Sequence, residues 1–249
     1  MKFSTKFAYR FRIVILIIFI FIFIFIFSFQ SFSIEKLWVK DYYDPYDNNK
    51  TEKAINSRIK NGWYPGGLEF DGLDFSMIWL NKSILNKISF PIYFKIKDFK
   101  IFTVQDTEDG INKQIPAKLA GGYIPISLSY FGDDIFIFAI LPEENYQLES
   151  FIISHWSKKE EQVVSSDINN LVAKGFFPIG FSFYLDYYVI LSIKIKGQKP
   201  EKDFYWGIDW VANEANNVNK YYQYLFDKGF YPSDYCENSQ QIGVLILHR

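Results

Sequence analysis

The sequence predicts an α+β fold of four tandem strand–helix–strand–strand repeats, with mostly antiparallel sheets that are each covered by one helix. The first observation is a phrase of glycine, an aromatic residue, any residue and proline, whose prolines lie 60, 53 and 54 residues apart. The second is a helical spacing of apolar residues before each phrase, and the third is strand alternation after it. The copies are Gly62–Pro65, Gly122–Pro125, Gly175–Pro178 and Gly229–Pro232.

Each unit is expected to open with a strand and continue with a short amphipathic helix. The opening strands are expected at Leu37–Val39, Phe99–Val104, Phe151–Trp156 and Phe204–Val211. Apolar residues then stand seven and three positions before the phrase glycine, which lines one helix face. The pairs are Ile55 and Ile59, Ile115 and Leu119, Ile168 and Val172, and Tyr222 and Phe226. Pro116 must either kink the second helix or occupy a shortened first turn.

The helix ends are also predicted from residue type. The phrase glycine takes the left-handed position directly after the helix, where the absence of a Cβ removes the steric cost. Short polar residues precede three of the helices and are the expected N-caps. These are Asp109, Ser165, Ser166, Asn216 and Asn217.

A hairpin completes each unit. Its first strand follows the phrase proline and alternates between apolar and polar residues, and a turn rich in Asp, Gly and Asn follows. The second strand is almost wholly apolar and should be buried on both faces. The second strands are Ser76–Leu80, Ile135–Leu141, Tyr188–Ile193 and Ile242–Leu247. A longer stretch, Asn81–Asp98, is expected to lengthen a hairpin.

Domain organisation follows from these elements. The units run over about 34–80, 81–142, 143–196 and 197–249. Because one unit cannot bury its own faces, residues 34–249 are expected to form a single repeat domain, stacked or closed into a pseudo-fourfold array.

Residues 1–33 have a different composition. Four basic residues and no acid precede the apolar run Ile13–Phe27, which indicates a signal peptide or an N-terminal membrane anchor. Export to the cell envelope or the exterior is expected in both cases.

Charge and cysteine content restrict the function classes. Without the first 33 residues the chain has 23 basic and 28 acidic side chains, a net charge of −5. Nucleic acid is therefore not an expected partner, because its binding depends on neutralising phosphates. The single cysteine, Cys236, allows no intramolecular disulfide. No metal site or cofactor is expected, since there are two histidines and no calcium-loop motif.

The order of the elements resembles the bacterial tandem repeat domain found beside beta-lactamase-like serine hydrolases and in polyglycine hydrolases. Trp38, Trp156, Trp210 and the four phrases carry the resemblance, which covers nearly all of residues 35–249. The sequence departs from that pattern where a Trp should close the second hairpin strand, since Trp79 alone supplies it. Residues 1–249 are not expected to include the hydrolase domain that usually accompanies such repeats. The resemblance implies an accessory or binding role and transfers no catalytic residue.

Candidate site residues are the positions at which one copy departs from its siblings. An acidic cluster, Glu69, Asp71 and Asp74, exceeds what the first turn requires and is a candidate ligand site, although turn chemistry explains most such acids. Tyr205, Trp206 and Trp210 make the opening strand of the fourth unit richer in aromatic residues than its equivalents and a candidate recognition surface. Cys236 is a candidate through its strand position, with His248 as its conceivable base.

Two functions are compatible with these residues. The first is an exported, non-enzymatic repeat protein that binds a protein, peptide or glycan partner. The alternative is a hydrolase-type enzyme whose central site forms where Glu69, Ser129, Ser182 and Cys236 converge on a pseudo-fourfold ring. The motif Ser57-x-x-Lys60 does not add a catalytic site, because no Lys-Thr-Gly accompanies it.

Overall fold

The computed structural model describes residues 36–85 and 94–248, and the described residues from Leu37 onward form one compact unit. The proposed signal or anchor at 1–33 lies outside the described residues. Within the described ranges, no helix is long and apolar enough to span a membrane.

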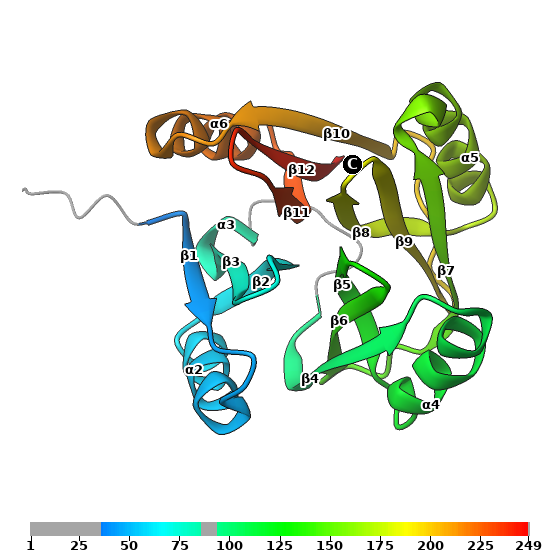
Figure 1. Ribbon diagram of the computed structural model, residues 1–249, viewed down its shortest axis with the longest axis horizontal. Helices are drawn as coiled ribbons and strands as arrows, with labels where there is room; N and C mark the ends of the chain where they lie inside the picture. The colour runs from blue at the N-terminus through cyan, green and yellow to red at the C-terminus, as the bar shows by residue number, and fades with distance from the viewer. Residues whose placement is uncertain (1–35, 86–93, 249) are drawn as a thin grey trace, which may run out of the picture. The chain divides into compact units, whose positions relative to one another are not determined.

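The predicted repeat is present four times (Figure 1). The first unit has β1 (Trp38–Tyr43), α2 (Asn48–Lys60), β2 (Trp63–Phe70) and β3 (Phe75–Asn81), followed by α3 (Lys82–Leu85). The second has β4 (Ile96–Gln105), α4 (Ile115–Leu119), β5 (Ile124–Phe131) and β6 (Asp134–Pro142). The third has β7 (Leu148–Ser157), α5 (Glu161–Ala173), β8 (Phe177–Tyr184) and β9 (Tyr187–Ile195). The fourth has β10 (Tyr205–Ala212), α6 (Ala215–Asp227), β11 (Tyr231–Glu237) and β12 (Gln241–His248).

All four sheets share one topology. The last strand of each unit lies in the middle and pairs antiparallel with both others, so the orders are β1-β3-β2, β4-β6-β5, β7-β9-β8 and β10-β12-β11. The first strand of each unit is called the outer strand here (β1, β4, β7 and β10), and the strand that contains the phrase proline is called the inner strand (β2, β5, β8 and β11). Every inner strand loses register directly after its phrase proline, at Pro65, Pro125, Pro178 and Pro232. A proline has no N–H for the ladder, and a bulge beside it redirects the strand. The phrase therefore sets both the helix end and a bulge.

The helix ends confirm three of the four predicted glycines but not the predicted N-caps. Gly62, Gly175 and Gly229 all have φ between 78° and 91° just beyond their helices. The fourth, Gly122, has φ of 94° but lies three residues beyond Leu119, where α4 ends. Ser165 and Ser166 instead lie inside α5, and Asn216 and Asn217 lie inside α6. The helices begin earlier because a further buried valine, Val164 or Val218, extends the apolar face by one turn.

The second unit has the least regular helix. Asp109 precedes a short π-helix, Gly110–Gln114, and makes no capping hydrogen bond with its side chain. Pro116 then occupies the first turn of the short α4, which is the second of the two alternatives that its position allowed. The stretch from Asn81 to Asp98 was expected to lengthen a hairpin. Its described residues instead end β3 at Asn81, form α3 and begin β4 at Ile96, while residues 86–93 of the stretch lie outside the described residues.

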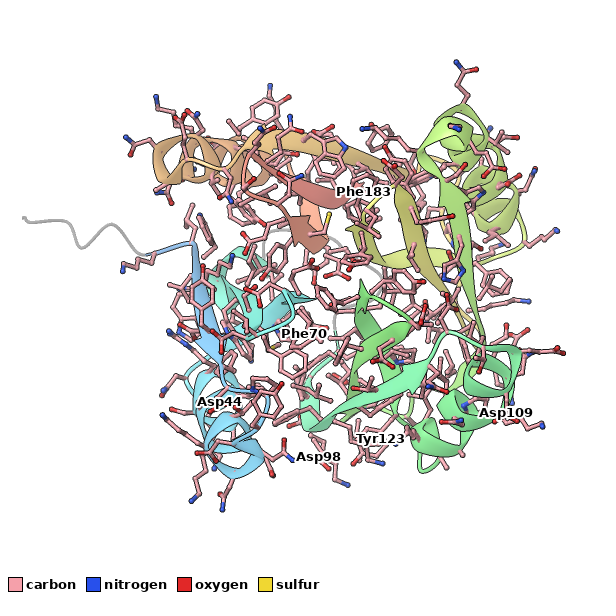
Figure 2. All side chains as sticks on the ribbon, in the orientation of Figure 1. Asp44, Phe70, Asp98, Asp109, Tyr123 and Phe183 are labelled. Carbon is pink, nitrogen blue, oxygen red and sulfur yellow. The ribbon has the colours of Figure 1, made fainter. Side chains whose placement is uncertain are left out.

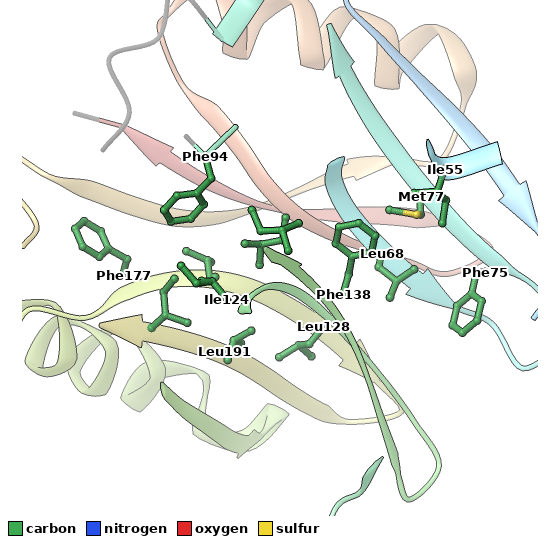
Figure 3. Packing of buried hydrophobic residues seen from close by; sticks show 14 of the residues in the cluster. Ile55, Leu68, Phe75, Met77, Phe94, Ile124, Leu128, Phe138, Phe177 and Leu191 are labelled. Carbon is green, nitrogen blue, oxygen red and sulfur yellow. The ribbon is translucent and has the colours of Figure 1, made fainter. Parts of the chain in front are cut away.

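The four inner strands close into a ring. Contacts run from β2 to β5, from β5 to β8, from β8 to β11 and from β11 back to β2. Of the two predicted arrangements, stacked or closed, the structure has the closed one. Apolar side chains from different units fill the space between the sheets, as Leu68, Ile124, Leu128, Phe138 and Leu191 do in Figure 3. Ring closure buries the sheet faces that a single unit would leave exposed.

Candidate functional site

The ring brings backbone N–H groups from all four units to one carboxylate. Asp234 Oδ1 accepts from the backbone nitrogens of Leu68 at 3.2 Å and Tyr235 at 2.9 Å. Its Oδ2 accepts from Leu128 at 3.1 Å and Phe181 at 2.8 Å. These four donors occupy the same position in their respective units. Asp234 is completely buried, so this carboxylate joins the four units at the centre of the ring.

The residues equivalent to Asp234 explain how the strands come so close. They are Gly67, Ser127 and Gly180. The hydroxyl of Ser127 donates a further hydrogen bond to Asp234 Oδ1 at 2.8 Å. A Cβ on Gly67 would lie 2.5 Å from the Tyr235 ring and 2.6 Å from Asp234 Oδ1, and φ there is +139°. The centre therefore admits one carboxylate, and small residues must surround it.

A second layer of polar residues lies two positions further along the inner strands. The hydroxyl of Ser129 accepts from the backbone nitrogen of Phe70 at 2.9 Å, and that of Ser182 accepts from Tyr130 at 3.0 Å. Ser129 also donates to Glu69 Oε2 at 3.3 Å. Glu69, Ser129, Ser182 and Cys236 are all buried, and none of them lines the grooves described below. They converge, as the hydrolase alternative requires, but their described contacts are internal.

The two buried carboxyl groups differ in their surroundings. Burial raises the pKa of Glu69, and the nearby charges of Asp234 and Glu237 raise it further. Burial also raises the pKa of Asp234, but the hydrogen bonds that it accepts from backbone and hydroxyl donors oppose that shift. Since these donors all favour a carboxylate, we infer that Glu69 is the member of the pair that holds a proton.

Cys236 has the environment of a structural thiol. Its exposed fraction is 1%, and burial raises its pKa, which opposes thiolate formation. It pairs with Gly243 in the hairpin, whereas His248 lies five residues further along β12 and contacts Phe230. This separation is about 16 Å of strand. The conceivable Cys236–His248 pair is therefore not formed.

The boundary between two neighbouring units, where the helix of one faces the outer strand of the next, is called a seam. Three of the seams contain a groove. Each groove lies between the helix of one unit and the outer strand of the next, and the volumes are about 860, 750 and 480 Å³. The first lies between α2 and β4, the second between α4 and β7, and the third between α5 and β10. The fourth seam, between α6 and β1, is filled, because the Trp38 ring stacks on Tyr222 with centroids 4.7 Å apart.

The first groove has the largest volume of the three. Part of it is an aromatic cluster of Phe70, Phe75, Phe131 and Phe136, whose neighbouring rings lie 4.4 to 5.5 Å apart. Tyr46 borders the groove with 85% of its surface exposed. Apolar walls with an exposed tyrosine and scattered polar groups are typical of ligand sites.

The other end of the first groove has a polar arrangement. The Tyr123 hydroxyl donates to Asp98 Oδ2 at 2.5 Å, and the two residues lie close together in Figure 2. The Lys100 ammonium lies 3.7 Å from the centre of the Tyr123 ring. The hydrogen bond to Asp98, which is strongest when the phenol keeps its proton, raises the pKa of Tyr123 to about 12.

The predicted aromatic residues of the fourth unit lie together in the third groove. Tyr205 is half exposed and packs against Phe230. The Trp206 indole nitrogen donates to Asn169 Oδ1 of α5 at 2.8 Å, which spans the groove. Trp210 packs edge-on against Phe181 and Phe183. The indoles of Trp206 and Trp210 thus hold the seam together, and Tyr205 is the most exposed of the three.

The acidic cluster of the first turn separates in the structure. Glu69 faces the ring centre, whereas Asp71 Oδ1 accepts hydrogen bonds from the backbone nitrogens of Leu73 at 2.8 Å and Asp74 at 2.9 Å. Asp71 therefore stabilises the turn, as turn chemistry predicts for an aspartate at this position. Asp74 contributes its own carbonyl to the same turn. The three acids form no common site.

The described part of the chain contains no group of three or more His, Cys, Asp or Glu side chains that could hold a metal ion. No protein-family model matches the chain, and no curated protein matches it.

Sequence reasoning missed two features. The first is Asp234, although one signal was present, since it is the only charged residue at a position held by glycine or serine in the other units. The second is the first groove, for which no local signal existed. Its two walls come from different units, and only the ring places them opposite each other.

Proposed function

We propose that the chain is an exported, non-enzymatic binding module that acts at the cell envelope or outside the cell, and that its ligand site is the groove between α2 and β4. Its partner is a protein, peptide or glycan, and residues 1–33 supply export and, if uncleaved, membrane attachment. The observation that carries this proposal is that three seams open as grooves on one scaffold, and the first has aromatic and polar walls.

The centre of the ring favours this function over the hydrolase alternative. A catalytic site needs a cavity in which a substrate can reach a nucleophile or base. The hydroxyls of Ser129 and Ser182 already accept hydrogen bonds from neighbouring strands, and the Cys236 thiol is buried with a raised pKa. The polar groups at the ring centre thus hold the units together.

The test uses the full chain and two sets of probes: random twelve-residue peptides on a display library, and neutral and acidic oligosaccharides of up to six sugars. We expect at least one set to bind, and Tyr46→Ala to weaken binding about fivefold, because an exposed stacking ring is lost. Tyr224→Ala is the matched control, since Tyr224 is also exposed and lies on α6, away from the groove. Failure of both sets to bind, or equal weakening by the two variants, would overturn the proposal.

A further inference from the structure

The first groove runs along the free edge of a β-strand. Six consecutive residues of β4, from Asp98 to Thr103, line it. Successive side chains of a strand point to opposite faces, so a groove that touches all of them must follow the strand edge. The contacts agree, because Lys100 lies over Tyr123 on one face while Phe99 stacks on Phe138 on the other.

This edge has unused backbone hydrogen-bonding groups. Among the strands that the structure describes, β4 pairs with β6 and with no other. In an antiparallel pair, every second residue directs its N–H and C=O away from the partner strand. Such an edge accepts an additional strand, and the six residues extend over about 20 Å, the length of an equally long extended peptide.

The charges around the groove favour a basic occupant. Its lining includes Glu52, Asp98 and Asp134 against one base, Lys100, a net charge of −2. The second groove has one lining acid, Glu149, which forms an ion pair with Lys194, and the third has no charged lining residue. The first groove is thus the acidic one of the three, and complementary charge selects a partner with Lys or Arg.

We infer that the groove between α2 and β4 binds an extended polypeptide segment with basic side chains, which adds to the free edge of β4 as a further strand. The inference rests on the proposed function and narrows it to one class of partner. Main-chain hydrogen bonds to β4 supply affinity, the aromatic cluster receives an apolar side chain, and Glu52 and Asp134 select for positive charge.

The decisive experiment measures binding of an alternating Lys–Val octapeptide to the full chain by fluorescence anisotropy. Two N-methylated versions carry the methyl groups on odd or on even residues. Strand addition uses the N–H groups of one set only, so one version should lose at least tenfold in affinity and the other should retain it. Equal affinity of all three peptides would overturn strand addition, as would equal loss in both methylated versions.

A second measurement tests the location and the charge preference. Glu52→Lys should weaken the Lys–Val peptide about fivefold, whereas Glu108→Lys, an exposed charge reversal outside the groove, should leave it unchanged. A Glu–Val octapeptide should bind more weakly than the Lys–Val peptide. If oligosaccharides bind and compete through Tyr46 while the peptides do not, this inference fails and the proposed function stands. If no probe binds, both fail.

Discussion

The ring centre and the seams are built from the same four units but use their polar groups in opposite ways. At the centre, four backbone N–H groups and one hydroxyl converge on Asp234. At three seams the outer strands keep a free edge, and the space beside them is open. At the centre, where the inner strands converge, ring closure pairs their polar groups with one another. At the seams, where the strands separate, the backbone polar groups of the outer strands remain available to a partner.

The largest expected effect comes from the ring centre. Asp234→Asn replaces one acceptor oxygen by an amide that cannot accept from the N–H groups facing it. We expect a loss of about 3–5 kcal/mol in the free energy of unfolding, measured by urea denaturation. Asp186→Asn, the same change in an exposed turn, should cost less than about 0.5 kcal/mol. A small effect of Asp234→Asn would contradict the central role of this carboxylate.

A related variant separates charge from packing. Asp234→Gly gives the fourth unit the residue that Gly67 and Gly180 supply in two others. It removes the carboxylate that the four N–H groups share, and among the described contacts only the N–H of Leu68 keeps another acceptor, the Ser127 hydroxyl at 2.7 Å. Added formate should raise the melting temperature of this variant and leave that of the wild type unchanged, because a bound anion stabilises the folded state. A variant indifferent to formate would show that the N–H groups do not form an anion site.

The filled fourth seam gives the next effect. Trp38→Ala removes the ring that stacks on the buried Tyr222 and should open a groove like the other three. The expected cost is about 2–3 kcal/mol, less than for a fully buried aromatic residue because Trp38 is partly exposed. Urea denaturation measures it, and Tyr205→Ala, at the half-exposed edge of an open seam, should cost less. Equal costs would mean that the filled and open seams do not differ.

The smallest effect concerns protonation at the second layer. The pKa of Glu69 is raised above 4.5 in the folded state, so the folded protein binds more protons than the unfolded chain over the interval between the two pKa values. Stability from this group is therefore complete below pH about 4.5 and falls as the pH rises toward the folded pKa. Glu69→Gln should flatten that decline in urea midpoints between pH 4 and 8. An unchanged slope would place the proton elsewhere.

Local sequence predicted the repeats well and the candidate site only in part. The glycines that end the helices and the hairpin strands are fixed by conformational preference and by alternation, both of which act between near neighbours. The N-caps at Ser165 and Asn216 were wrong because burial of Val164 and Val218 extends the helices. Among the candidate residues, Tyr205, Trp206 and Trp210 lie together, whereas Glu69, Asp71 and Asp74 do not.

The sequence by itself determined the repeat, its element order and the bulge-forming proline, because these depend on residue types that recur at fixed spacing. Only the tertiary structure decided that the units close into a ring, that Asp234 accepts from four units, and that α2 faces the free edge of β4. The physical reason is distance along the chain. Leu68 and Asp234 are 166 residues apart, and no local pattern encodes a hydrogen bond across that separation.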